Sequence, residues 1–298
     1  MQAQQLMVDG DKRLALRRYS PQGTPRASIV IGGAMGVRQS FYEPFARWLC
    51  GQGLQVWTFD YRGSGDSLNG APLRGFEADL LDWARDYEAV IDAAKAALPE
   101  QPLYLLGHSL GAQLPGFLQN PEQVDGLISI AAGSGYWREN APKLRRSILY
   151  FWFVLVPLAT RIWGYFPGRK LRKVGDLPRG VILQWRRWCL NPRYSVGAEG
   201  DLAAQSYARV RFPVLALSMT DDELMTLAGT RSLVSFYAGA PSLVERIAPA
   251  DVQAHRIGHF GFFREQFSHS LWPQLLDKLH RLASLTAVQQ AGVAQTTA

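Results

Sequence analysis

The sequence predicts an α/β fold: a mostly parallel central sheet, helices on both of its faces and a helical cap insertion. Three observations carry this prediction. Short apolar runs alternate with amphipathic stretches along most of the 298 residues. A Gly-x-Ser-x-Gly pentapeptide, Gly107–Gly111, separates a buried-strand pattern from a helix-like stretch. The alternation breaks near Ser134, where the chain becomes basic and rich in tryptophan, and it resumes after residue 205.

The individual elements follow from local pattern. Residues 14–19 indicate an early antiparallel strand. Buried strands are expected at the short apolar runs, which are 27–31, 55–59, 102–106, 126–131, 213–217 and 243–247. Helical spacing predicts helices at 41–51, 76–97, 112–118, 224–237 and 265–282. The predicted organisation is therefore a core formed by 1–133 and 206–285, a cap at 134–205 and a disordered tail at 286–298.

Composition excludes several classes of protein. Apolar residues make up 47% of the chain, enough for one large domain with an insertion. The two cysteines, Cys50 and Cys189, lie far apart, which excludes a disulfide framework and a cysteine zinc site. The N-terminus lacks the basic start and apolar run of a signal peptide, so a cytoplasmic location is expected.

The pentapeptide predicts a nucleophile. A serine on a sharp turn from a strand into a helix has its hydroxyl exposed at the edge of the sheet, and flanking glycines avoid side-chain clashes there. Ser109 occupies this position between Gly107 and Gly111. The alternative without catalytic function is a glycine-rich loop with an incidental serine. The strand and helix patterns around the pentapeptide make this alternative weaker.

A base and an acid follow in the chain order that such a serine requires. After the strand at 213–217 stands Asp221-Asp222-Glu223, and after the last strand stands His259 between Gly258 and Gly261. Asp222 is the first choice of acid and Asp221 the alternative; one of the two is also expected to cap the next helix. His259 would take the proton from the serine, and the acid would orient the imidazole.

Four other histidines compete with His259. His255 is the rival base, because it lies only four residues earlier. His108 is expected to pack beside the nucleophile, and His269 and His280 to be surface or packing residues. The oxyanion hole would use the N–H of Leu110 and one from the loop after residues 27–31, with Ala34 as first choice and Met35 as alternative. The alternative without catalytic function is that the glycines of this loop only form a tight turn.

Taken together, these residues resemble the α/β-hydrolase superfamily, over about residues 14–282. The match includes the elbow at 107–111, the loop Asp60-Tyr61-Arg62-Gly63-Ser64-Gly65, the acid at Asp222 and the base at His259. Within the superfamily the chain is similar to a bacterial group of predicted hydrolases, through Gly258–Arg264 and Trp185–Cys189. One departure is Gly32, which stands where many relatives carry a histidine at the start of the oxyanion loop.

The resemblance implies a serine hydrolase that cleaves an ester, thioester or related acyl bond of an apolar or lipid-like substrate, without metal or cofactor. An acyltransferase with the same triad is the first alternative. A membrane-surface or ligand-binding module with a vestigial triad is the second. Ser109 argues against the dehalogenases of the superfamily, which use an aspartate at the elbow.

The predicted cap carries the chain's excess of positive over negative charge. Between Ser134 and Tyr194 stand 13 Lys/Arg and 2 Asp/Glu, whereas the whole chain carries a net charge of +7. Its uncharged run, 147–160, is shorter than the roughly 20 residues that a transmembrane helix needs. Three interpretations stay open: a helix buried against the core, a lining for an acyl pocket, and peripheral contact with an anionic membrane. Nucleic acid is not needed to explain this segment.

Overall fold

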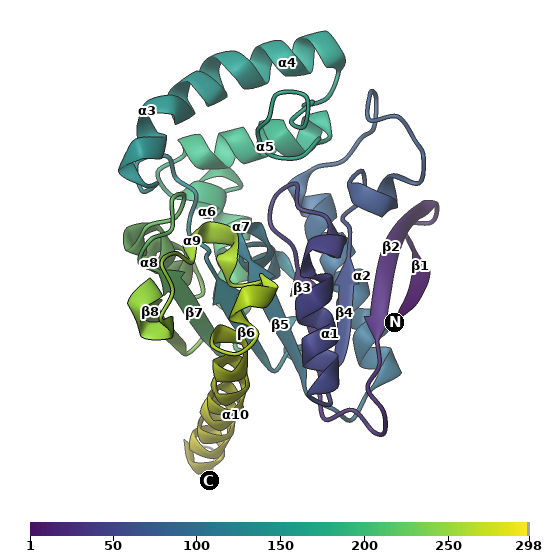
Figure 1. Ribbon diagram of the computed structural model, residues 1–298, viewed down its shortest axis with the longest axis vertical. Coiled ribbons are helices and arrows are strands. Elements are labelled where there is room, and N and C mark those ends of the chain that lie inside the picture. Colours follow the sequence, from purple (N-terminus) through teal and green to yellow (C-terminus); the bar gives the residue numbers. More distant parts are fainter. Residues whose placement is uncertain (297–298) are drawn as a thin grey trace.

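The computed structural model describes residues 1–296 and contains an eight-stranded sheet in the order β1-β2-β4-β3-β5-β6-β7-β8 (Figure 1). β1 and β2 form an antiparallel hairpin, β2 pairs antiparallel with β4, and all other neighbours are parallel. The strands are β1 Gln2–Val8, β2 Lys12–Tyr19, β3 Ser28–Gly32, β4 Gln55–Phe59, β5 Leu103–His108, β6 Gly126–Ile130, β7 Val214–Met219 and β8 Ser242–Ile247. The predicted fold class is confirmed.

Helices cover both faces of this sheet. Every residue of the five central strands, β3 to β7, is buried, as expected of parallel strands that read as continuous apolar runs. One buried cluster joins a sheet face to α1 and α10, and the other joins the opposite face to α2 and α8. These helices are α1 Glu43–Gly51, α2 Leu80–Ala97, α8 Leu227–Phe236 and α10 Leu271–Thr296.

α2 begins four residues later than its periodicity predicts, because a capping box sets its start. The Asp79 carboxylate accepts hydrogen bonds from the N–H groups of Leu81 and Asp82, each at 2.8 Å. The Asp82 carboxylate in turn accepts from the Asp79 N–H at 2.8 Å. Together they satisfy N–H groups that have no partner inside the helix.

One further expectation is wrong in detail. The helix predicted at 112–118 is replaced by two 3-10 turns, η3 Ser109–Ala112 and η4 Leu114–Phe117, because Pro115 has no N–H to donate to the carbonyl four residues earlier. α10 runs from Leu271 to Thr296, and the disordered tail expected at 286–298 stays a prediction. Residues 297–298 lie outside the described part of the chain.

The remaining helices lie beyond the carboxyl ends of the strands or in short connections (Figure 1). α3, the π-helical η6, α4 and α5 form the outermost layer, and we call them the cap helices. The bounds are α3 Pro142–Tyr150, η6 Phe151–Leu155, α4 Val156–Trp163, α5 Arg179–Leu190, α6 Tyr194–Ala198, α7 Asp201–Arg209 and α9 Gly258–Gly261. The short turns are η1 Gln39–Tyr42, η2 Gly65–Leu68, η5 Pro121–Gln123, η7 Pro249–Val252 and η8 Glu265–Phe267. None of the described helices combines the length and apolar character that a transmembrane span requires.

Candidate active site

Ser109 sits on a strained turn between β5 and η3. Its φ is +53°, a left-handed conformation that a residue with a side chain rarely adopts. The flanking glycines are required by space: a Cβ on Gly107 would lie 2.5 Å from the Ala112 N, and one on Gly111 would overlap the Gly32 carbonyl oxygen. The elbow is therefore pressed against the end of β3, and Ser109 itself carries the backbone strain.

The side chains of His259 and Asp222 meet at the edge of the sheet where Ser109 lies. The His259 Nδ1 lies 2.9 Å from one Asp222 carboxylate oxygen and 3.1 Å from the other. Both side chains are almost fully buried. A carboxylate can only accept, so Nδ1–H donates, and in the neutral ring this leaves Nε2 as an acceptor. This is the tautomer that a general base for a serine hydroxyl needs.

The neighbours of Asp222 hold the loop that carries His259. The Asp221 carboxylate accepts from the N–H of Ile257 at 2.9 Å and of Gly258 at 3.1 Å. Glu223 accepts from the His259 N–H at 3.1 Å. Sequence reasoning assigns Asp221 only as an alternative acid, and it misses Glu223, although the run of three acids is visible in the chain.

Electrostatics support this arrangement at Glu223. Burial opposes its charged form, but hydrogen bonds from backbone N–H groups, including that of His259, and from Arg256 outweigh burial and lower the pKa of Glu223. The expectation that Asp221 or Asp222 caps the next helix is wrong. Thr226 caps α8 by accepting from the Gly229 N–H, and the Asp222 Oδ1 closes a tighter turn with the N–H groups of Leu224 and Met225.

A buried hydrogen-bond chain joins the oxyanion loop to the loop of His259. The His108 Nε2 lies 3.0 Å from the His259 carbonyl oxygen, and the His108 Nδ1 lies 2.9 Å from the Tyr42 Oη. Burial, together with the neighbouring His259, holds the pKa of His108 well below its ordinary value, so the ring is neutral. Because a carbonyl only accepts, Nε2–H donates to it and Nδ1 accepts from the Tyr42 hydroxyl.

The same chain changes the oxyanion assignment. The Ala34 N–H donates to the Tyr42 Oη at 2.8 Å, so it is not available to an oxyanion, contrary to the first expectation. No described residue accepts from the Met35 N–H, the alternative donor. The Leu110 N–H belongs to the first turn of η3, where N–H groups have no partner within the helix. The N–H groups of Met35 and Leu110 are thus the candidate donors that have no acceptor among the described residues.

Packing explains the missing histidine at the start of the oxyanion loop. A Cβ on Gly32 would lie 2.5 Å from the ring of Tyr87, which is fully buried on α2. The Tyr87 ring occupies the space that a side chain at position 32 would need. The other three histidines are excluded as the base because their side chains are exposed, whereas Ser109 and His259 are buried. They are His255, His269 and His280.

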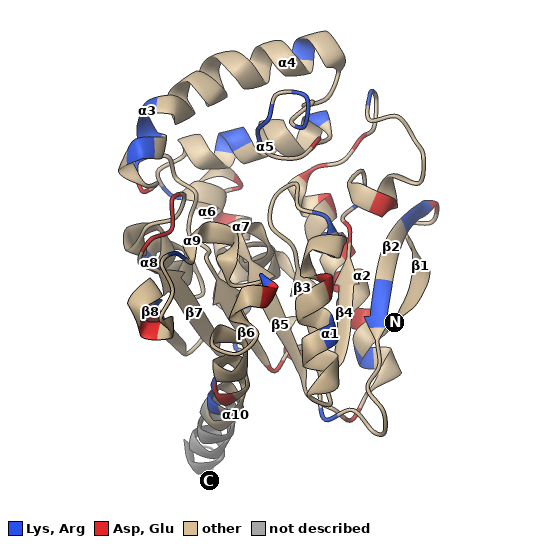
Figure 2. Cartoon of the chain, viewed as in Figure 1, with Lys and Arg blue, Asp and Glu red and all other residues tan. Residues whose placement is uncertain are grey.

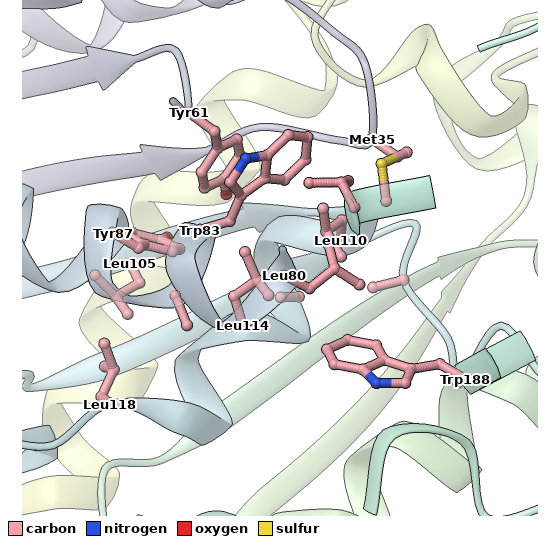
Figure 3. Close-up of a cluster of buried hydrophobic side chains, with 14 of the residues drawn as sticks. Met35, Tyr61, Leu80, Trp83, Tyr87, Leu105, Leu110, Leu114, Leu118 and Trp188 are labelled. Atoms are coloured by element: carbon pink, nitrogen blue, oxygen red, sulfur yellow. The ribbon is translucent and has the colours of Figure 1, made fainter. Parts of the chain in front are cut away.

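An apolar cluster surrounds the elbow and continues into the cap helices. Met35, Leu110 and Trp188 belong to it, and they come from the oxyanion loop, the elbow and α5 (Figure 3). The cap also contributes buried side chains from α4, from the segment before α5 and from α5 itself, which are Val156, Ala159, Phe166, Leu177 and Val181.

The described residues contain no group of three or more His, Cys, Asp or Glu suited to a metal ion.

The role of Tyr42 can be tested by removing its hydroxyl. Tyr42→Phe leaves two buried groups without partners, the Ala34 N–H and the His108 Nδ1. We expect it to lower the free energy of unfolding by about 2 kcal/mol and to lower kcat, because the oxyanion loop loses its support. Urea unfolding and kcat for a soluble ester measure these effects.

Tyr61→Phe is the matched control, since the buried Tyr61 hydroxyl has no hydrogen-bond partner among the described residues. Equal stability of the two variants would contradict a structural role for the Tyr42 hydroxyl. A rise in kcat of Tyr42→Phe would instead identify the freed Ala34 N–H as an oxyanion donor.

Comparison with known proteins places this geometry in a family. The family model described as serine aminopeptidase S33 matches residues 23–174, just over half of the chain. Human monoglyceride lipase is 33% identical over 109 residues, which are 36% of this chain and 35% of the human protein. The match thus spans about a third of that relative's length. The monoacylglycerol lipase of Mycolicibacterium smegmatis is 24% identical over 287 residues, covering 90% of this chain and 91% of its own.

The fold agrees with this assignment. A soluble variant of monoglyceride lipase from Saccharomyces cerevisiae, solved with a substrate analog, superposes with a TM-score of 0.65 at 14% identity, covering 94% of each chain. At that identity the likeness concerns the fold alone. The family match, the nucleophile-elbow geometry and the sheet order agree: the chain belongs to the serine aminopeptidase S33 family of the α/β-hydrolase superfamily.

Proposed function

We propose that this protein is a serine hydrolase that cleaves the ester bond of an apolar, lipid-like substrate through an acyl-enzyme. The observation that carries the proposal is the buried hydrogen bond between the His259 Nδ1 and Asp222, 2.9 Å long, at the sheet edge where Ser109 sits. The residue before Ser109 supports it, because the ring of His108 lies 5.2 Å from that of His259, centroid to centroid.

In the proposed reaction, the Ser109 Oγ attacks the ester carbonyl carbon while its proton passes to the His259 Nε2. The resulting oxyanion is held by the N–H groups of Leu110 and Met35. Collapse of this intermediate breaks the bond to the alcohol, which leaves with the proton from His259. Water, deprotonated by His259, then attacks the acyl-enzyme, and the acid and free Ser109 are released. Asp222 orients the imidazole and stabilises its charged form in both halves of the reaction.

The proposed substrate class follows from the surroundings of the elbow. The side chains of Met35 and Leu110 belong to an apolar cluster that includes Trp188 and other cap residues. Such surroundings suit an acyl chain better than a charged or sugar-like group. The human and mycobacterial relatives are named as monoglyceride and monoacylglycerol lipases. We therefore propose an ester with a single acyl chain, such as a monoacylglycerol.

A fluorophosphonate probe tests the nucleophile, because it reacts only with an activated serine. We expect one labelled site, at Ser109, and no labelling of Ser109→Ala. In parallel, p-nitrophenyl esters of increasing acyl length should be hydrolysed with a kcat/KM that rises with chain length. Ser195→Ala is the matched control, since Ser195 is a fully buried serine outside the elbow. Folded protein that neither labels nor hydrolyses any ester would refute the proposal.

A further inference from the structure

The cap helices present an apolar face to solvent. Six large apolar side chains on α3, η6 and α4 are between 36% and 60% exposed. We call them the outer cap face; they are Leu149, Tyr150, Phe153, Val154, Leu158 and Ile162. In the rest of the described chain, four large apolar residues reach this exposure, and all of them lie outside α3, η6 and α4: Met1, Met7, Leu202 and Leu243. Exposed apolar side chains are thus concentrated in one segment of 14 residues, which marks an interaction site.

This face is held in place by the opposite side of the same helices. Phe151, Trp152, Val156 and Ala159 are buried against α5 and the core. The Arg186 side chain on α5 donates to the Trp152 carbonyl oxygen at 2.6 Å. Rotation of the helix to hide its exposed residues would therefore expose an equally apolar set, so the outer face needs a partner of its own.

Positive charges flank the outer cap face (Figure 2), and most of them form no ion pair among the described residues. From residue 140 to residue 175 the chain has no Asp or Glu and eight Lys or Arg: Lys143, Arg145, Arg146, Arg161, Arg169, Lys170, Arg172 and Lys173. Of these eight, only Arg169 forms an ion pair among the described residues, with Asp176 at 3.9 Å. Figure 2 shows the basic residues at both ends of the α3–α4 layer and in the loop beside α5, with no acidic residue on α3 or α4.

The combination selects one kind of partner. Repulsion between eight like charges disfavours binding of a second copy of the same face. A nucleic-acid phosphate backbone would leave the six exposed apolar side chains without apolar contacts. A bilayer with anionic lipids satisfies both features, since apolar side chains enter below the headgroups while Lys and Arg stay at the level of the phosphates. We propose that the outer cap face docks the protein on a membrane surface that contains anionic lipid.

Docking there would bring the membrane close to the elbow. The loop between α4 and α5 packs directly on the oxyanion loop, where a Cβ on Gly36 would lie 2.5 Å from the Gly175 N. The segment that faces the lipid is thus continuous with the segment that covers the site. The proposal does not depend on the chemistry of Ser109, so Ser109→Ala protein can be used to test it without hydrolysing lipid.

Sedimentation with vesicles is the test. The full-length Ser109→Ala protein is mixed with vesicles of phosphatidylcholine alone, or of equal parts phosphatidylcholine and phosphatidylglycerol. We expect cosedimentation with the anionic vesicles, weaker binding to the neutral ones, and loss of binding as salt is raised. Leu158→Ser/Ile162→Ser should weaken partition at least about tenfold, and Arg146→Gln/Arg161→Gln should weaken it on anionic vesicles only.

Matched controls lie outside the cap. Leu202→Ser/Leu243→Ser removes two other exposed apolar residues, and Arg13→Gln/Arg231→Gln removes two exposed charges without ion pairs among the described residues. Both controls should bind as the parent does. Equal binding to both kinds of vesicle, no binding, sedimentation without vesicles, or equal effects of cap and control variants would each overturn the proposal. Hydrolysis of a water-soluble ester by the same variants carrying Ser109 reports separately on the proposed activity.

Discussion

Replacing Asp222 with asparagine is expected to lower kcat about ten-thousandfold with the fold intact. The Asp222 Oδ1 accepts from the N–H groups of Leu224 and Met225 at 2.7 and 2.8 Å, and an asparagine oxygen can keep both bonds. Its NH2 group would then face the His259 Nδ1 as a donor. The imidazole would have to carry its proton on Nε2, where it cannot accept the proton of Ser109.

Asp221→Asn is the matched control, because it is the adjacent residue and the alternative acid. Its carboxylate contacts only the N–H groups of Ile257 and Gly258 among the described residues. We expect a loss of about tenfold or less in kcat and a lower free energy of unfolding, by about 1 kcal/mol. kcat for a soluble ester and urea unfolding of both variants separate the two roles. The reverse order of kcat would identify Asp221 as the acid.

Gly111→Ala is expected to prevent the chain from reaching its native fold. The added Cβ would overlap the Gly32 carbonyl oxygen and lie 2.9 Å from the Gly32 Cα. Both are backbone atoms of a central strand, so neither can rotate away as a side chain would. Ordinary overpacking costs about 1–3 kcal/mol, and a shift of β3 against β5 would add to it, within a total stability of about 5–15 kcal/mol.

Soluble yield and the urea midpoint measure this effect. Gly51→Ala is the control: Gly51 ends α1, has a negative φ, and a Cβ added to it would meet no atom within 4 Å. We expect its stability to equal or exceed that of the parent by about 0.5–1 kcal/mol, because alanine loses less conformational entropy than glycine in a helix. A Gly111→Ala protein with an unchanged urea midpoint would show that the elbow is not packed as described.

Much of the fold was predictable because the central strands are encoded locally. Each of β3 to β7 is a short apolar run bounded by turn residues, and the prediction placed all five within two residues of their ends. β1 was not predicted, because three of its seven residues are glutamines and the pairing with β2 is what stabilises it. The helix predicted at 112–118 did not form, because Pro115 has no N–H to donate to the carbonyl four residues earlier.

For the site, the order of residues along the chain was informative, because the elbow motif is short and the acid and the histidine each follow a particular strand. It singled out Ser109, Asp222 and His259, and the structure brings the last two into contact. It did not show that the Ala34 N–H already has an acceptor, because that acceptor is the hydroxyl of Tyr42, whose own partner is His108, 66 residues away. No local pattern reports such a hydrogen bond.

The sequence by itself determined the order of the strands' apolar runs, the elbow at Ser109 and the excess of positive charge after residue 134, because each is a property of neighbouring residues. The tertiary structure alone decided which N–H groups are left open, why position 32 must be glycine, and which apolar side chains of the cap remain in solvent. These depend on contacts between segments far apart in the chain. Burial and hydrogen-bond satisfaction are settled only when those segments pack.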